Sequence, residues 1–187
     1  MPLETPADER APSGIYKGTK LFDPAKDSDV DPGRLAFGQE RLLVTPLQMA
    51  MVAATIANDG VVMKPQVIDR IVAPDGSVIV RSKPERLDRA IKTETARAVA
   101  AMMKDAVEEG TGTAARIDGI TVGGKTGTAE TGIAGLNTTW FIAYAGKDRP
   151  EIAIAAVVEQ QNSTGGETAA PVAREVLQAL LGSTANS

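Results

Sequence analysis

Four consecutive residues, Lys125-Thr126-Gly127-Thr128, carry the groups that an acyl-transfer site needs to hold a carboxylate. The lysine supplies positive charge, the threonine hydroxyls supply hydrogen-bond donors, and the glycine lets a ligand approach the backbone. They follow an apolar run, Ile120-Thr121-Val122, which predicts a strand. The pattern favours a carboxylate-binding, oxyanion-stabilising strand edge, although it contains no nucleophile.

The same region also satisfies the phosphate-binding loop pattern G-x-x-x-x-G-K-[ST], from Gly119 to Thr126. That motif needs a compact loop before the lysine and a helix that opens at it. Here the interior is typical of a strand, and residues 126–132 are poor helix formers because they include two glycines and three threonines. A nucleotide site is therefore disfavoured, and a solvated lysine at an exposed strand end is the other alternative that the motif alone leaves open.

The composition limits which chemistry is available. The 187 residues include no Cys and no His, so thiolate and imidazole chemistry are excluded, and neither a metal nor a cofactor is expected. A formal net charge of -4 argues against a non-specific nucleic-acid surface. No apolar run approaches the length of a membrane-spanning helix, and the first residues do not resemble a signal peptide.

Two helices and a hairpin are expected before the lysine motif. The sequence Thr45-Pro46-Leu47-Gln48 predicts a helix start, with a threonine cap, a proline in the first turn and a glutamine that completes a capping box. This helix should end at Asn58-Asp59-Gly60 and, being apolar almost all round, should be buried. The turn signal Pro74-Asp75-Gly76 predicts a β-hairpin. A second helix is expected from a Thr93 cap to Gly110, followed by a flexible loop.

Three strands are predicted over 119–130, 138–146 and 151–159. The link between the last two is short, so they should be antiparallel neighbours, and the last is apolar on both faces. A final helix should begin near Ala170. The expected fold is α+β, with an antiparallel sheet covered by helices on both faces.

The expected domain organisation has three parts. Residues 1–34 are polar and lack periodicity, which suggests an irregular lead-in. Residues 35–182 form the ordered domain, and residues 183–187 are a tail.

The chain resembles the transpeptidase domain of penicillin-binding proteins. Gly124-Lys125-Thr126-Gly127-Thr128-Ala129-Glu130, followed by Trp140-Phe141-Ile142-Ala143-Tyr144, is similar to the third box of that family and its next strand. Phe37-Gly38-Gln39 and the segments 44–50 and 56–60 match the same family in the correct order. Within it, the chain looks most like the class B, monofunctional type, and resembles the actinobacterial penicillin-binding protein A group.

The resemblance implies a serine D,D-transpeptidase that cross-links peptidoglycan stem peptides and is acylated by β-lactams. Lys125 and Thr128 are then the expected catalytic residues, and Lys125, Thr126, Gly127 and Thr128 the substrate-binding set. The lysine would supply positive potential, and both threonine hydroxyls would bind the carboxylate of D-Ala-D-Ala or of a β-lactam. The backbone N–H of Thr128 would form half of an oxyanion hole, while Gly127 keeps the edge open.

The family's other two boxes, S-x-x-K and S-x-N, do not occur in the sequence. None of the serines has Lys at the third following position or Asn at the second: Ser13, Ser28, Ser77, Ser82, Ser163, Ser183 and Ser187. We therefore expect the chain to be the C-terminal part of a transpeptidase domain and to be inactive without the missing N-terminal half.

The expected partners are stem peptides ending in D-Ala-D-Ala, β-lactams and that N-terminal half, but not nucleic acid. By resemblance, the full-length protein is membrane-anchored and acts on the extracytoplasmic face of the cell membrane, although this chain carries no targeting signal. Two alternatives remain: a non-catalytic homologue that binds muropeptides or serves as a division scaffold, and a β-lactamase-like or D,D-carboxypeptidase-like hydrolase.

Overall fold

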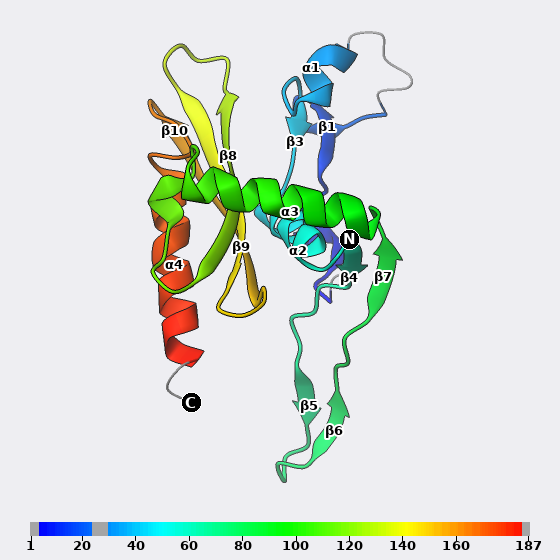
Figure 1. The fold of residues 1–187 in the computed structure, drawn as a ribbon. Coiled ribbons are helices and arrows are strands. Elements are labelled where there is room, and N and C mark those ends of the chain that lie inside the picture. Colours follow the sequence, from blue (N-terminus) through cyan, green and yellow to red (C-terminus); the bar gives the residue numbers. More distant parts are fainter. Residues whose placement is uncertain (1–3, 24–29, 185–187) are drawn as a thin grey trace.

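The computed structural model describes residues 4–23 and 30–184, and a three-stranded antiparallel sheet lies at its centre (Figure 1). The strands are β8 (Thr121–Glu130), β9 (Asn137–Gly146) and β10 (Ile152–Gln161). Their order is β10-β9-β8, and the β8–β9 register is continuous, from Thr121 opposite Gly146 to Glu130 opposite Asn137. The three predicted strands and their antiparallel arrangement are confirmed.

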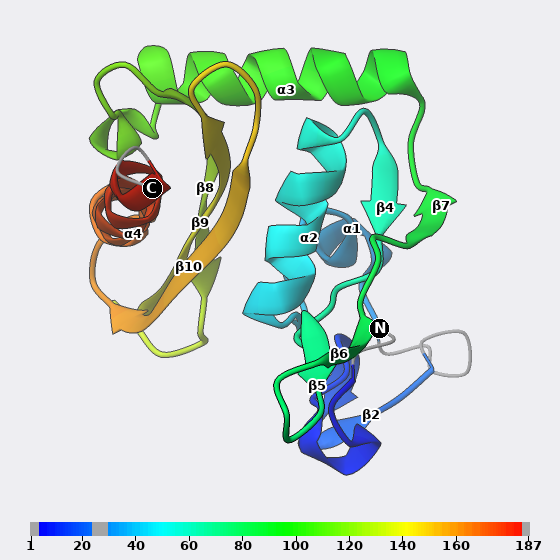
Figure 2. The ribbon, with the colours of Figure 1, turned by 90° about the horizontal axis from the view of Figure 1, so that it is seen from below.

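Helices cover both faces of this sheet, as Figure 2 shows. One face packs against α4 (Ala169–Thr184), and the other against α2 (Pro46–Ala57) and part of α3 (Thr93–Glu108). The long helix α3 runs across the end of both layers. The expected α+β fold, with an antiparallel sheet between helices, is confirmed.

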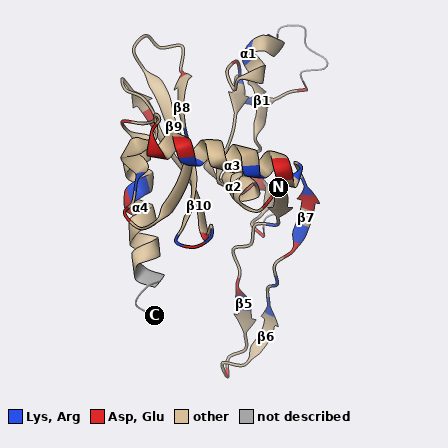
Figure 3. Ribbon diagram, viewed as in Figure 1, with Lys and Arg blue, Asp and Glu red and all other residues tan. Residues whose placement is uncertain are grey.

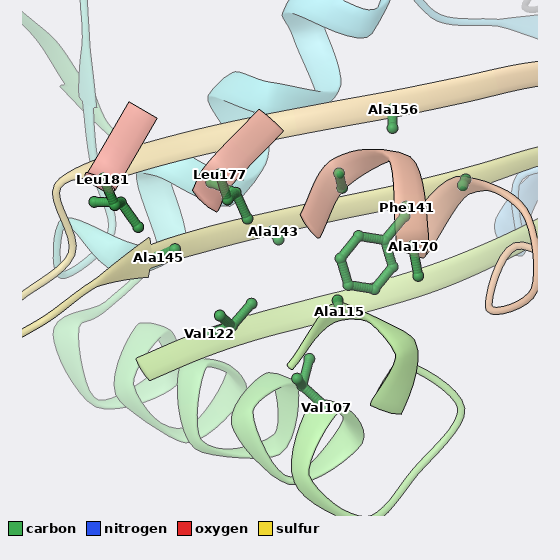
Figure 4. Close-up of a cluster of buried hydrophobic side chains, with 12 residues drawn as sticks. Val107, Ala115, Val122, Phe141, Ala143, Ala145, Ala156, Ala170, Leu177 and Leu181 are labelled. Carbon is green, nitrogen blue, oxygen red and sulfur yellow. The ribbon is translucent and has the colours of Figure 1, made fainter. Parts of the chain in front are cut away.

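The core between the sheet and α4 is built around one aromatic ring. Phe141 and Leu177 are both 0% exposed, and Val122 and Leu181 are buried beside them. Figure 4 shows Phe141 beside α4, with Ala115 and Val107 on the side of the ring that faces away from α4. Fully burying a side chain of this size contributes about 1.5–3 kcal/mol, so this cluster fixes α4 to the sheet.

The second core lies between the sheet and α2 with α3. Its buried members are Ala53, Met103, Ile142 and Tyr144. The Tyr144 hydroxyl donates a hydrogen bond of 2.8 Å to the Ala100 carbonyl, which satisfies the one polar atom of that ring. Burial raises the pKa of Tyr144 above its ordinary value, because the charged phenolate loses its solvation there.

Helix α2 begins as predicted but is less buried than predicted. Thr45 Oγ1 accepts a 3.1 Å hydrogen bond from the Gln48 amide, which confirms the cap. The capping box is wrong, because the Thr45 amide instead donates to Ser13 Oγ at 3.1 Å. Leu47 is 41% exposed and Val52 36%, since the sheet and α3 cover only part of the helix surface.

A long arm leaves the body of the protein between α2 and α3. Its base is the pair β4 (Val61–Met63) and β7 (Arg86–Arg89), and its tip is the hairpin β5 (Arg70–Val72) and β6 (Val78–Arg81). Figure 1 shows this hairpin projecting away from the sheet. The hairpin predicted at Pro74-Asp75-Gly76 is confirmed, whereas the charged strand β7 was not predicted.

The start of α3 and the loop after it differ from expectation. Thr93 does not cap the helix: Lys92 occupies the cap position, and the Thr93 hydroxyl accepts a hydrogen bond from Arg89 at 3.0 Å. After α3, the predicted flexible loop contains a 3-10 turn, η3 (Thr113–Ala115), whose last residue is fully buried. The turn packs against Phe141 because small residues occupy it.

The predicted irregular lead-in contains regular structure. Strand β1 (Gly14–Lys17) pairs with β2 (Lys20–Leu21) and β3 (Leu42–Leu43), and its Ile15 is buried. A 3-10 turn, η1 (Ala7–Glu9), precedes this sheet, and α1 (Pro32–Ala36) lies within its long connection. The interpretation of 1–34 as irregular is therefore wrong for these residues, and 1–3 and 24–29 lie outside the described ones.

The C-terminal helix continues beyond the predicted ordered region. It runs to Thr184, so the first two residues of the expected tail, 183 and 184, belong to α4, and residues 185–187 lie outside the described residues. None of the helices in the described parts of the chain is long and apolar enough to cross a membrane. Figure 3 shows that charged residues are spread over many elements, among them α3, β7 and the link between β9 and β10.

Candidate active-site strand

The lysine motif lies in the middle of β8, just after two glycines that neighbouring rings require. A Cβ atom on Gly124 would lie 2.3 Å from Phe141 Cζ, and one on Gly123 would lie 2.2 Å from Tyr144 Cζ. The two rings belong to the two different cores, so they press against β8 from opposite faces. The Gly-Gly pair thus leaves room for an aromatic ring on each face of the site strand.

Lysine and threonine side chains leave this strand on opposite faces. Lys125 lies opposite Ile142, which belongs to the core with α2 and α3, whereas Thr126 lies opposite Phe141 in the core with α4. Directly opposed residues share a face of the sheet. Lys125 is exposed, and its Nζ donates a hydrogen bond of 2.6 Å to the Thr126 carbonyl.

Both threonine hydroxyls already have a protein partner. Thr126 Oγ1 lies 2.8 Å from Thr111 Oγ1, and Thr128 Oγ1 accepts a 3.3 Å hydrogen bond from the Gly165 amide. Thr111 follows α3, and Gly165 lies between β10 and α4. Two distant loops therefore meet the motif on the face that Thr126 and Thr128 share.

Gly127 is enclosed more tightly than expected for a residue that keeps an edge open. A Cβ there would lie 3.2 Å from Trp140 Cβ on the neighbouring strand. Gly165 in turn approaches the backbone of Gly127 and Trp140. A Cβ added to Gly165 would lie 2.3 Å from the Trp140 carbonyl oxygen and 2.5 Å from the Gly127 carbonyl oxygen. Glycine at position 165 therefore lets the loop after β10 lie directly on the backbone of the two strands.

The outer edge of β8 is open. Within the described ranges, β9 is the only strand that pairs with β8, so the outward backbone groups have no strand partner. Such an edge can bind an extended peptide through main-chain hydrogen bonds. Hydroxyl donors and a cationic side chain beside the edge can, in addition, hold an anionic end group of that peptide.

The site is an open strand edge, and two hollows in the described surface lie away from its lysine and threonines. One hollow of about 240 Å³ lies between α2 and β4. A second, of about 220 Å³, is lined by Arg34, Phe37, Gln39 and Glu130, so it touches only the far end of β8. Neither includes the lysine or either threonine.

The sequence located the motif but not its supporting residues. All four predicted site residues lie together on β8, and the phosphate-loop alternative is wrong because residues 121–130 are paired strand throughout. Thr111 and Gly165 were missed as partners of the hydroxyls. Their loops are rich in Gly and Thr, which signals close backbone approach but does not say to which strand.

A match to a family model identifies the protein family of the chain. The penicillin-binding protein transpeptidase domain matches residues 17–178, which is most of the sequence and includes all of β8. The chain therefore belongs to the family of penicillin-binding protein transpeptidase domains.

Named relatives are consistent with this family. The chain is 38% identical over 156 residues to the peptidoglycan D,D-transpeptidase PbpA of Mycolicibacterium smegmatis, which covers 80% of this chain. It is 35% identical over 177 residues to PbpA of Mycobacterium tuberculosis, which covers 91%. A ceftriaxone acyl-enzyme complex of penicillin-binding protein A from M. tuberculosis shares its fold, with a TM-score of 0.73 at 33% identity over 79% of this chain.

The match covers only part of each relative. The aligned region is 32% of the M. smegmatis protein, 36% of the M. tuberculosis protein and 34% of the acyl-enzyme structure. The chain thus spans about a third of the length of the relatives it matches.

Proposed function

We propose that this chain provides the carboxylate-binding strand of a serine D,D-transpeptidase that cross-links peptidoglycan stem peptides and is acylated by β-lactams. The observation that carries the proposal is the open edge of β8, which presents Lys125, Thr126 and Thr128 in a member of the penicillin-binding protein family. An extended stem peptide ending in D-Ala-D-Ala fits such an edge, because a strand edge binds extended backbone.

Each residue of the motif has a distinct role in this proposal. The hydroxyls of Thr126 and Thr128 donate to the terminal carboxylate of the peptide or of the β-lactam. Hydrogen bonds to a charged group are worth about 1.5–3 kcal/mol each, so the two hydroxyls decide which acyl donors are held. Lys125 supplies positive potential from the other face, and the Thr128 amide stabilises the oxyanion, where loss of one donor typically costs about 10²–10³ in rate.

The nucleophile is proposed to come from another segment. No serine among the 187 residues is followed by lysine at the third position, and covalent catalysis needs a nucleophile with an adjacent base. We call the polypeptide or complex that unites this chain with the serine-bearing segment the complete transpeptidase. Its action on peptidoglycan would place it outside the cytoplasmic membrane, held there by a membrane anchor in the full-length protein.

The proposal is tested by acylation. Incubation of the 187-residue chain with a fluorescent penicillin should give no covalent adduct in intact mass spectrometry, whereas the complete transpeptidase should be acylated stoichiometrically. Lys125→Ala in the complete transpeptidase should lower the second-order acylation rate constant by about 10²–10³.

Lys147→Ala is the matched control, because Lys147 is also exposed but lies just after β9, away from the motif. It should leave the rate unchanged. A stoichiometric adduct on the chain alone would show that the nucleophile is present after all. A change below about threefold for Lys125→Ala would remove the lysine from the site.

A further inference from the structure

The loop after α3 brings a hydroxyl to the site strand. Thr111 Oγ1 lies 2.8 Å from Thr126 Oγ1, although the two residues are 15 positions apart. Gly166 makes room for this loop, because a Cβ there would lie 2.3 Å from the Thr111 carbonyl oxygen. The contact therefore depends on close packing of three segments, which are β8, the loop after α3 and the loop before α4.

The number of protons decides what this contact can do. A threonine hydroxyl has one proton to donate and two lone pairs to accept with. When Thr126 donates its proton to a ligand carboxylate, it can only accept from Thr111. Thr111 must then be the donor of the pair, and its hydrogen bond turns the Thr126 proton away from the protein.

The second threonine of the motif shows the same arrangement with no ambiguity of direction. The Gly165 amide can only donate, so in its 3.3 Å contact Thr128 Oγ1 is the acceptor. The hydroxyl proton of Thr128 is left for an external acceptor. Both hydroxyls of the motif thus receive, or can receive, a donor from behind.

We propose that Thr111 is a positioning residue for carboxylate recognition, which it serves by donating to Thr126 and so directing the Thr126 proton to the ligand. This inference rests on the proposed function, because it takes the carboxylate of a stem peptide or β-lactam as the acceptor. Thr111 itself touches no reacting atom. It affects binding of the ligand's carboxylate only through Thr126, and this specific effect distinguishes it from a residue that simply supports the fold.

The experiment compares two acylating agents that differ only in that carboxylate. Second-order acylation rate constants are measured on the complete transpeptidase with benzylpenicillin and with its methyl ester, which keeps the lactam but removes the negative charge. Thr111→Val removes the hydroxyl at nearly constant volume, and Thr111→Ser keeps it. Thr111 is exposed, so both variants should fold, and thermal melting verifies this; Thr111→Ala replaces Thr111→Val if the latter does not fold.

We expect Thr111→Val to lower the acid-to-ester rate ratio about three- to tenfold, the effect of one neutral hydrogen bond, and Thr111→Ser to keep it within about twofold. An unchanged ratio in Thr111→Val, including equal slowing with both agents, overturns the inference and leaves the proposed function standing. If the wild type itself does not favour the acid, carboxylate recognition by Thr126 fails, and this inference fails with it.

Discussion

Gly124→Ala tests whether the site strand is held between aromatic rings. The new Cβ would lie 2.3 Å from Phe141 Cζ, well inside the ordinary van der Waals contact distance of about 3.5–4.0 Å between carbon atoms. Phe141 is 0% exposed and cannot move into solvent, so the ring or the strand must shift within a packed core. Overpacking of this kind costs about 1–3 kcal/mol.

The assay is thermal unfolding of the 187-residue chain. A chain of this size loses about 2–4 °C in Tm per kcal/mol, so Gly124→Ala should melt well below the wild type. Gly182→Ala is the matched control: Gly182 lies in α4 with nothing within 4 Å of its added Cβ, so alanine should stabilise by up to about 1 kcal/mol.

A double-mutant cycle identifies the ring as the cause. In a Phe141→Leu background the clash is relieved, and Gly124→Ala should cost less there than in the wild type by about 1–2 kcal/mol. The reasoning is refuted if Gly124→Ala melts like the wild type, or if its cost is the same in both backgrounds.

Three further predictions concern the rest of the chain. Thr45→Ala should lower the stability of α2 by about 1 kcal/mol and Thr45→Ser much less, since only the serine keeps the cap; a urea melt in which both behave alike would contradict the cap. Hydrogen bonds from Arg97 at 2.9 and 3.0 Å hold the pKa of Asp59 below its ordinary value, so their stabilisation is complete above the unfolded pKa and is lost as the pH falls through the folded one. The difference in Tm between the wild type and Asp59→Asn should therefore be constant above about pH 5 and shrink below about pH 4; a difference independent of pH would exclude the ion pair as its source. Because no described strand covers the outer edge of β10, whose residues 152–158 are all apolar, the isolated chain should associate as its concentration rises, and a monomer at every concentration in light scattering would disprove this.

Local signals in the sequence predicted the parts of the fold that local interactions determine. The cap at Thr45, the turn at Pro74-Asp75-Gly76 and the strand pattern around Trp140 depend on near neighbours, and each is confirmed. The capping box failed because the Thr45 amide found a partner 32 residues away, at Ser13. No local pattern can indicate such a contact.

The elements that were missed lack a strong pattern of their own. Strand β7 reads Arg-Leu-Asp-Arg, which has no strand-like pattern, and it pairs with β4 at the base of the arm, more than 20 residues earlier in the chain. Strand β1 similarly depends on Leu42 and Leu43, far along the chain. At the candidate site, the motif was visible in the sequence, whereas Thr111 reaches Thr126 only through the packing of α3 against β8.

The order of the central strands has a consequence for how this domain can vary. β8, β9 and β10 follow one another directly, joined by residues 131–136 and 147–151, so their pairing closes only short loops. The alignment of Lys125 with Ile142 is therefore set within a single stretch of chain and needs no contact from the arm or the N-terminal sheet. Insertions or deletions in those outlying parts can change the shape of the domain without moving the motif along its strand. Within residues 121–161, by contrast, a shift of one residue would exchange the faces of the lysine and the threonines.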